Sequence, residues 1–171
     1  HDMFINNLVN CAGFGDCKDF KDMDLDLQLK MVEVDCSAVL AFCRLFIDDM
    51  IKNNEGHIIN VSSITAKQNN PHGCAYGAVK AGLTSFGTSL FEEARKYGIK
   101  VTTIHPDMTD TDLYRDADFT CAKEAGCYLE SEQIAQAVRF LLEQPKGTVI
   151  PELTIRPQYH RIARKAKNAD A

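Results

Sequence analysis

No apolar run in the 171-residue sequence approaches the roughly 20 residues that a transmembrane helix needs, and no signal peptide is visible at its start. It also lacks a basic surplus: 24 acidic residues face 19 basic ones, which argues against a nucleic-acid-binding protein. No C-x-x-C pair occurs among the seven cysteines, so free thiols in a reducing compartment are favoured over a disulfide framework. These absences predict a cytoplasmic protein with neither nucleic acid nor membrane as its partner.

Short β-type runs alternate with long stretches whose apolar residues recur at helical spacing. With 45% hydrophobic residues and no repeat or linker, we expect a single domain over residues 1–171. The expected strands are 4–10, 57–61, 100–105 and 148–155, and the expected helices are 26–53, 73–97 and 131–143. This alternation predicts an α/β fold, a parallel sheet with right-handed crossovers and helices on both faces. A ligand site is then expected beyond the carboxyl ends of the strands, after Asn10, Val61 and His105.

Several boundary residues mark where these elements should begin or end. Gly56 is expected to stop the first helix, Gly98 to cap the second at its carboxyl end, and Ser131 to cap the third at its amino end. Residues 108–129 lack clear periodicity and are interpreted as a mobile lid over a substrate. A solvated tail is the interpretation of the basic residues Arg156, Arg161, Arg164, Lys165 and Lys167.

The strongest chemical signal is Tyr76 with Lys80 at the start of the second expected helix, and Ser63 thirteen residues before the tyrosine. Residues at i and i+4 share one helical face, about 5–6 Å apart. A phenol has a pKa near 10, and a neighbouring ammonium should lower that pKa toward the neutral range. A Tyr-x-x-x-Lys pair alone is usually an ordinary helix face. Ser63 changes this, because it follows strand 57–61 and is placed to hold a carbonyl oxygen while Tyr76 donates a proton.

Four segments, in order, resemble the short-chain dehydrogenase/reductase family. Residues 10–13, Asn-Cys-Ala-Gly, are similar to its Asn-Asn-Ala-Gly element, and 58–63 to the segment that presents the catalytic serine. Tyr76 and Lys80 fall on the family's catalytic tyrosine and lysine. Residues 106–111 are similar to its Pro-Gly-x-x-x-Thr segment, which contacts the nicotinamide end of the cofactor. The resemblance covers essentially the whole chain, and four elements in order are more specific than any one of them.

The resemblance implies an oxidoreductase that uses NAD or NADP to interconvert a carbonyl and an alcohol in a small molecule. Tyr76 would transfer the proton, Lys80 would lower the pKa of the tyrosine and bind the nicotinamide ribose, and Ser63 would orient the substrate oxygen. Asp35 would serve in a proton relay. The residues implied to border the cofactor are Asn10, Ala12, Gly13, Tyr76, Lys80, Pro106, Thr109 and Thr111. A homodimer or homotetramer formed through helices 26–53 and 73–97 is also implied.

The sequence departs from the family pattern in four ways. Cys11 replaces an Asn, Asp107 replaces a Gly whose backbone must then tolerate a side chain, and Asp35 stands where an Asn usually helps to hold a relay water. The glycine-rich phosphate loop is absent: residues 13–15 begin a G-x-G-x-x-G, but Lys18 occupies its third glycine position. The expected fold is therefore a Rossmann-like parallel sheet that lacks its first strands.

Two other interpretations stay open at this stage. The missing phosphate loop suggests a truncated, catalytically incompetent member of the family with a structural or interaction role, whose strand 4–10 would be an unpaired apolar edge. An epimerase or dehydratase also shares Tyr-x-x-x-Lys, but the separation of Ser63 and Tyr76 favours a reductase. No His, Cys or Asp spacing indicates a metal site. For the 171 residues alone we expect no measurable reductase activity, because one wall of the dinucleotide crevice would be missing.

Overall fold

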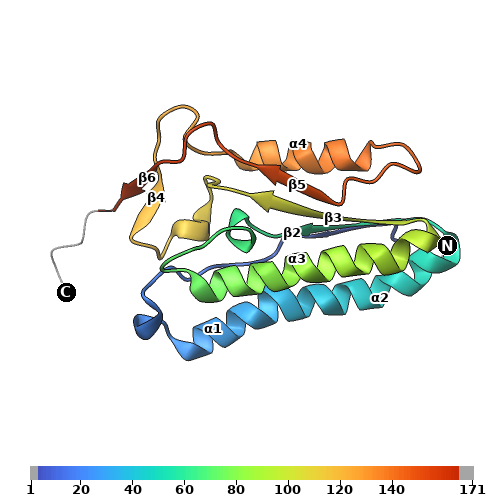
Figure 1. Ribbon diagram of the computed structural model, residues 1–171, viewed down its shortest axis with the longest axis horizontal. Helices are drawn as coiled ribbons and strands as arrows, with labels where there is room; N and C mark the ends of the chain where they lie inside the picture. The colour runs from blue at the N-terminus through green and yellow to red at the C-terminus, as the bar shows by residue number, and fades with distance from the viewer. Residues whose placement is uncertain (1–3, 166–171) are drawn as a thin grey trace.

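A parallel sheet with helices on both faces forms the body of the computed structural model, which describes residues 4–165 (Figure 1). The strands lie in the order β1-β2-β3-β5, and their bounds are Asn7–Asn10, Gly56–Val61, Ile99–Pro106 and Glu152–Ile155. Helices α2 (Ala38–Asn53) and α3 (Cys74–Ala94) cover one face, and α4 (Ser131–Leu142) covers the other. The α/β fold expected from the sequence is therefore confirmed.

The first long helical stretch is interrupted, which differs from the single helix expected over residues 26–53. It begins with α1 (Leu25–Val32), whose first turn is capped by Asp24 accepting a hydrogen bond from the backbone N–H of Leu27 at 2.9 Å. A π turn over Glu33–Ser37 then leads into α2. Residue spacing does not reveal this turn, because its buried member is held by partners that are distant in the sequence.

The end of α2 is set by Asn54 and not by Gly56, as the sequence had suggested. Asn54 adopts the left-handed conformation, with φ of 50°, and its N–H bonds back to the helix. Gly56 instead starts β2, where an added Cβ would lie 2.6 Å from the Met50 sulfur. Gly98 does cap its helix in the left-handed conformation, with φ of 77°, after a short 3₁₀ turn over Arg95–Tyr97.

The start of α4 and the lengths of two strands also differ from expectation. Glu130 and not Ser131 is the capping residue, because the Glu130 side chain and the Gln133 side chain bond reciprocally to backbone N–H groups at the helix start. Both outer strands are shorter than the apolar runs that predicted them, since pairing covers only Asn7–Asn10 and Glu152–Ile155.

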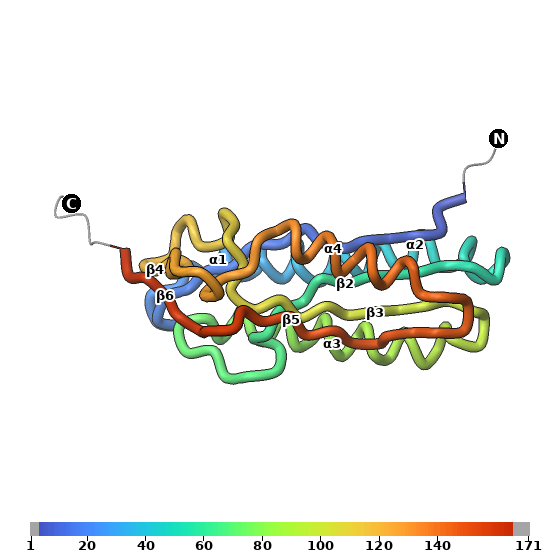
Figure 2. The backbone as a smooth tube through the Cα atoms, turned by 90° about the horizontal axis from the view of Figure 1, so that it is seen from above, coloured from blue at the N-terminus to red at the C-terminus, as the bar shows by residue number. Residues whose placement is uncertain are grey.

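Residues 108–129 and the basic tail pair with each other, which the sequence did not predict, while the side chains of Arg156, Arg161, Arg164 and Lys165 are exposed, as expected of a solvated tail. Strand β4 (Phe119–Cys121) pairs antiparallel with β6 (Ile162–Arg164). The pair lies at one end of the molecule (Figure 2), beyond the end toward which the arrows of the parallel strands point in Figure 1. The Lys165 ammonium donates to the carbonyls of Tyr114 and Arg115 at 2.6 and 2.7 Å. Distant partners order both segments, and Lys167 lies outside the described residues.

Two hydrophobic clusters hold the helices to the sheet, one on each face. The α2/α3 face is packed by Val39, Cys43, Met50, Ile58, Leu83, Phe91, Ala94, Ile99 and Val101. The α4 face has a smaller buried set, Ile59, Ile104 and Leu141. No helix within residues 4–165 is long and apolar enough to cross a membrane.

Candidate functional site

Three predicted site residues meet where the carboxyl end of β2 approaches the first turns of α3. The strand ends at Val61, and Ser63 follows two residues later. Tyr76 and Lys80 lie one turn apart near the start of α3, with the lysine nitrogen 5.5 Å from the centre of the tyrosine ring. All three predicted side chains are buried; Tyr76 is only 8% exposed. The predicted grouping of a hydroxyl, a phenol and an ammonium is present in the structure.

The pKa of Tyr76 is raised, which is opposite to the depression expected from a neighbouring ammonium. Burial is the largest cause, because it disfavours the charged phenolate. The Ser63 hydroxyl lowers this pKa, whereas Asp35 and Cys17 raise it further. The positive charge of Lys80 does not bring the Tyr76 pKa below its usual value, because that charge lies closer to a carboxylate than to the phenol ring.

That carboxylate belongs to Asp35, in the π turn between α1 and α2. Its Oδ2 lies 3.0 Å from the Lys80 nitrogen, and its Oδ1 accepts a hydrogen bond from the backbone N–H of Phe14 at 3.0 Å. Gly13 leaves room for it, since an added Cβ would lie 2.6 Å from Oδ2. Asp35 therefore lies beside the predicted group and contacts Lys80 directly.

Ser63 is held in place by the turn that follows it. Its Oγ accepts hydrogen bonds from the backbone N–H and the hydroxyl of Thr65, at 3.2 and 3.0 Å. Ser63 thus caps a short 3₁₀ turn over Ile64–Ala66. The hydroxyl can still donate its own proton to an oxygen placed between it and Tyr76.

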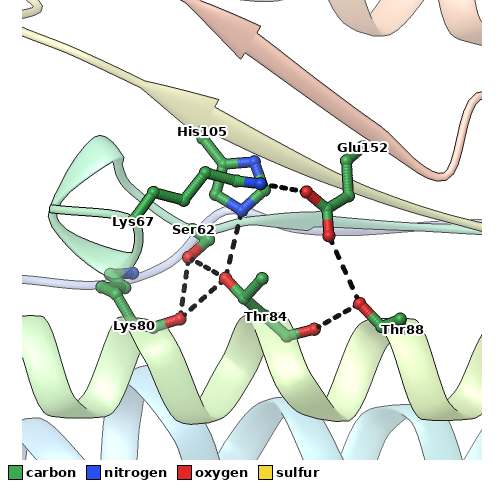
Figure 3. A network of polar contacts seen from close by, with 7 residues as sticks. All are labelled: Ser62, Lys67, Lys80, Thr84, Thr88, His105 and Glu152. Carbon is green, nitrogen blue, oxygen red and sulfur yellow. Dashed lines mark hydrogen bonds and ion pairs between the residues drawn. The ribbon is translucent and has the colours of Figure 1, made fainter.

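A buried polar network behind the site was not recognised from the sequence (Figure 3). Ser62 Oγ and Thr84 Oγ1 each lie 2.9 Å from the Lys80 carbonyl oxygen, and they lie 2.9 Å from each other. Thr84 Oγ1 is also 3.1 Å from Nε2 of His105, whose pKa is lowered chiefly by burial. A neutral imidazole, two hydroxyls and a helix carbonyl therefore join α3 to the ends of β2 and β3. Two sequence features could have indicated this network: Ser62 is adjacent to Ser63, and Thr84 lies one helical turn after Lys80.

An ion pair extends this network toward β5. The Lys67 ammonium pairs with the Glu152 carboxylate, which also accepts a hydrogen bond from the Thr88 hydroxyl at 3.4 Å (Figure 3). The pKa of Glu152 is lowered, mainly because of Lys67. The support of the site thus spans β2, β3, β5 and α3.

The segment after β3 carries the remaining predicted cofactor residues but makes no hydrogen bond to the tyrosine or lysine within residues 4–165. The Thr109 hydroxyl donates to the Asp107 carbonyl at 2.8 Å, and exposed Thr111 caps a turn over Asp112–Tyr114. Pro106 is the last residue of β3. The structure brings these residues to the expected edge of the sheet without joining them to the buried group.

Asp107, where the family has glycine, is accommodated without a positive φ. Its buried carboxylate accepts hydrogen bonds from the Met108 backbone N–H at 2.8 Å and from Arg156 Nε at 2.7 Å. The side chain that the sequence marked as a departure therefore joins the end of β3 to the segment after β5.

The end of β1 and the segment after it contain one residue that supports the sheet, one that is exposed and one that packs against Tyr76. The Asn10 amide donates to Asn60 Oδ1 at 2.8 Å and to Cys43 Sγ at 3.6 Å, so it braces neighbouring strands. Ala12 is exposed. Farther on, Gly15 lies against the Tyr76 ring, where an added Cβ would be 3.2 Å from a ring carbon.

Tyr114 is a further group at the site that sequence reasoning missed. Its pKa is raised chiefly by burial, and Tyr76 and Cys17 are among the groups that raise it further. The centre of its ring lies 5.4 Å from the centre of the Phe119 ring in β4. Tyr114 lies in the segment interpreted as a lid, so only the tertiary structure brings it within electrostatic range of Tyr76.

The chain is an α/β protein of Rossmann-like architecture that carries a buried serine–tyrosine–lysine group. A family model described as short chain dehydrogenase matches residues 4–120. An uncharacterised oxidoreductase of Staphylococcus epidermidis is 33% identical over 153 residues, 90% of this chain and 65% of that protein. The chain belongs to the short-chain dehydrogenase family.

Solved structures resemble the chain closely in fold. A metagenomic short-chain oxidoreductase in complex with NADP is 29% identical, with a TM-score of 0.74 over 91% of this chain and 63% of that one. An alcohol dehydrogenase from the archaeon Thermococcus sibiricus, complexed with 5-hydroxy-NADP, has a TM-score of 0.82 at 24% identity, over 92% and 65% of the two chains. The chain thus spans about two thirds of the length of the proteins it resembles.

Proposed function

We propose that these residues form the catalytic part of an NAD- or NADP-dependent oxidoreductase that interconverts a carbonyl and an alcohol. The observation that carries the proposal is the convergence of Ser63, Tyr76 and Lys80 in one buried group at the carboxyl end of β2. The two solved relatives described above hold NADP or a derivative of it, and a 4-hydroxyisoleucine dehydrogenase of similar fold, 18% identical, holds NADH; these cofactors support NADP or NAD here. The proposal concerns an enzyme that contains this chain, since the chain spans 65% of the S. epidermidis relative.

The donor set fits the nicotinamide-ribose half of such a cofactor. The Lys80 ammonium has three N–H donors and, among residues 4–165, contacts only Asp35 Oδ2 and the Val61 carbonyl, the latter at a long 3.4 Å. One donor is therefore available for a ribose hydroxyl, and the Tyr76 hydroxyl lies on the same side of α3. No glycine-rich loop that could cradle phosphates occurs within the described residues.

The chemistry proposed for the chain's own residues is proton transfer and positioning. The cofactor supplies hydride chemistry when bound. Ser63 donates a hydrogen bond to the substrate oxygen and fixes its position, and Tyr76 gives its hydroxyl proton to that oxygen or takes it back. Lys80 holds the ribose and, with Asp35, sets the electrostatic surroundings of the phenol. The raised pKa of Tyr76 keeps the phenol protonated at neutral pH, as a proton donor must be.

The proposal includes self-association through the long helices. Apolar side chains remain exposed along α1 and α2; they are Leu25, Leu29, Val32, Leu40, Phe42 and Leu45. A second copy of the chain covering this stripe would remove it from water. We also place the protein in the cytoplasm, which is supported by seven cysteines that are all free thiols. A monodisperse monomer at micromolar concentration in light scattering would contradict the proposed dimer or tetramer.

The catalytic role is tested in a fusion that places the glycine-rich amino-terminal segment of an active relative ahead of this chain. Tyr76→Phe removes only the hydroxyl, so we expect a loss of at least about 100-fold in turnover with little change in cofactor affinity. Lys80→Met should reduce both turnover and cofactor affinity. Tyr97→Phe, on the exposed end of the same helical stretch, is the matched control and should leave both unchanged. Activity of Tyr76→Phe within tenfold of the parent would rule out its assigned role.

The second candidate is a non-catalytic chain that binds no dinucleotide productively, favoured by the absence of a phosphate loop within residues 4–165. A ligand that binds only the folded state raises its melting temperature. For the 171-residue chain alone we expect no measurable turnover and a Tm unchanged by NADP or NAD at millimolar concentration. The fusion should gain both activity and a cofactor-dependent rise in Tm. A fusion without either gain would favour the non-catalytic candidate.

A further inference from the structure

The ion pair between Lys80 and Asp35 is almost completely removed from solvent. The two side chains are 6% and 0% exposed, and Nζ and Oδ2 are 3.0 Å apart. Opposite charges attract far more strongly in such an environment than at a surface, and a buried charge without its partner is costly. The pair therefore acts electrostatically as one neutral unit.

The backbone around Asp35 is shaped to bring its carboxylate to Lys80. Asp35 is the buried residue of the π turn Glu33–Ser37, and π turns inside helices occur frequently at functional sites. Gly13 provides the space for Oδ2, and the Phe14 N–H fixes Oδ1. Three separate features thus hold one carboxylate against one ammonium.

We propose that Asp35 positions the Lys80 ammonium and offsets its charge, so that Tyr76 holds its proton more tightly than a phenol beside an unpaired ammonium would. The inference rests on the proposed function, in which Tyr76 is the proton-transfer group. Asp35 is then a positioning residue, because it acts on Tyr76 through Lys80. It also differs from the proton relay that the family resemblance implied for this position.

Relative distances support this assignment. The Lys80 nitrogen is 5.5 Å from the Tyr76 ring centre but 3.0 Å from the Asp35 oxygen. An opposite charge at 4–6 Å lowers the pKa of an acid by about 1–3. The pKa of Tyr76 is nevertheless raised, by burial first, and Asp35 is among the groups that raise it. The attraction that Lys80 would exert on a phenolate is therefore offset by its partner.

The other titratable groups around Tyr76 cannot replace Asp35 in this role. Cys17, from the loop after β1, also raises the pKa of Tyr76, but by less than Asp35 does. Tyr114, from the turn after β3, is itself an acid whose pKa is raised. Among the titratable side chains of residues 4–165, only Asp35 both contacts Lys80 and is fully buried.

The test is a direct titration of Tyr76, which needs neither cofactor nor turnover. The 171-residue chain is labelled with ¹³Cζ-tyrosine, and the signal of Tyr76 among the five tyrosines is identified by its loss in Tyr76→Phe. In Asp35→Asn we expect the midpoint of the Tyr76 signal at least one pH unit below that of the wild type, a tenfold change in proton affinity. The matched control is Asp48→Asn, which removes an exposed carboxylate 2.8 Å from Arg44 and should titrate as the wild type does.

A second variant keeps the test decisive if Asp35→Asn alone does not fold, as shown by circular dichroism. Asp35→Asn combined with Lys80→Met removes both charges and leaves none unpaired. A neutral pair predicts a Tyr76 midpoint within about half a pH unit of the wild type in this double variant. An unchanged midpoint in folded Asp35→Asn, or a midpoint shifted by a full pH unit in the double variant, would overturn the proposal.

The outcomes separate this inference from the proposed function. If Tyr76→Phe stays active in the fusion, the catalytic assignment fails while the titration result still describes the ion pair. If Tyr76→Phe is inactive and the titration midpoints do not move, the tyrosine is catalytic and Asp35 does not tune it.

Discussion

The two faces of the sheet are packed to different degrees, and neighbouring residues on the same strands show it. In β1, Leu8 packs against the cluster beneath α2 and α3, whereas Val9, on the opposite face, is 42% exposed. In β2, their register partners Ile58 and Ile59 are both fully buried. The α4 face is therefore covered at β2 but open at β1.

This difference shows where the molecule can carry a site. The proposed catalytic group is anchored on the well-packed face, where α3 lies against the sheet and the Ser62–Thr84–His105 network joins them. Rigid support on that side holds side chains in a fixed geometry. The open β1 edge, beside a groove of about 260 Å³ lined by residues that include Leu8, Val9 and Phe42, leaves apolar surface for another polypeptide segment.

The largest expected effect comes from a matched pair of substitutions in β2. Ile58→Ala should cost about 3–5 kcal/mol of unfolding free energy, because dense neighbours cannot collapse into the cavity. Ile59→Ala should cost less, about 2–3 kcal/mol, since the smaller cluster beneath α4 can relax. Urea unfolding at pH 7 measures both. Equal losses would show that the two faces are packed alike.

A pH-dependent loss of unfolding free energy, of intermediate size, is expected from a buried histidine on the α4 face. His57 lies on the same face as Ile59 and contacts Thr102 Oγ1 at 3.0 Å; burial lowers its pKa from 6.5 to about 4. The unfolded chain therefore binds more protons than the folded one between these pH values, so stability is complete above pH 6.5 and falls as the pH drops toward 4. The loss should be about 3 kcal/mol at most.

Replacing that histidine should remove much of the pH dependence. His57→Gln keeps a polar side chain but cannot be protonated, so its stability should fall less between pH 7 and pH 4 than that of the wild type. His160→Gln, at an exposed position, is the control. Chemical unfolding at the two pH values gives the comparison, and parallel curves for His57→Gln and the wild type would contradict the assignment.

The smallest effect on stability is expected at the open edge. Val9→Thr should change the unfolding free energy by no more than about 0.5 kcal/mol, because Val9 is already 42% exposed. Leu8→Ala, one residue away, should cost about 1–2 kcal/mol. If the β1 edge drives association of the isolated chain, Val9→Lys should also reduce its aggregation in light scattering. A loss at Val9 as large as that at Leu8 would mean that the edge is covered.

Much of the fold and part of the site could be predicted from local sequence. Apolar periodicity placed the parallel strands and the long helices, because side-chain spacing directly reflects which face is buried. The i, i+4 spacing of Tyr76 and Lys80, together with the strand-end Ser63, was enough to predict their grouping. Gly98 was predictable as a cap, because glycine adopts the left-handed conformation without cost.

What the sequence alone determined is the pattern that depends on near neighbours along the chain: strand, helix and the spacing of Tyr76 and Lys80. Tertiary structure decided the rest, because contacts between distant residues outweigh local preference. It set the π turn at Asp35, the pairing of β4 with β6, and the electrostatic influence of Tyr76 on Tyr114. It also reversed the expected pKa shift of Tyr76, since burial and the charge on Asp35, forty-one residues away, act only after the chain has folded.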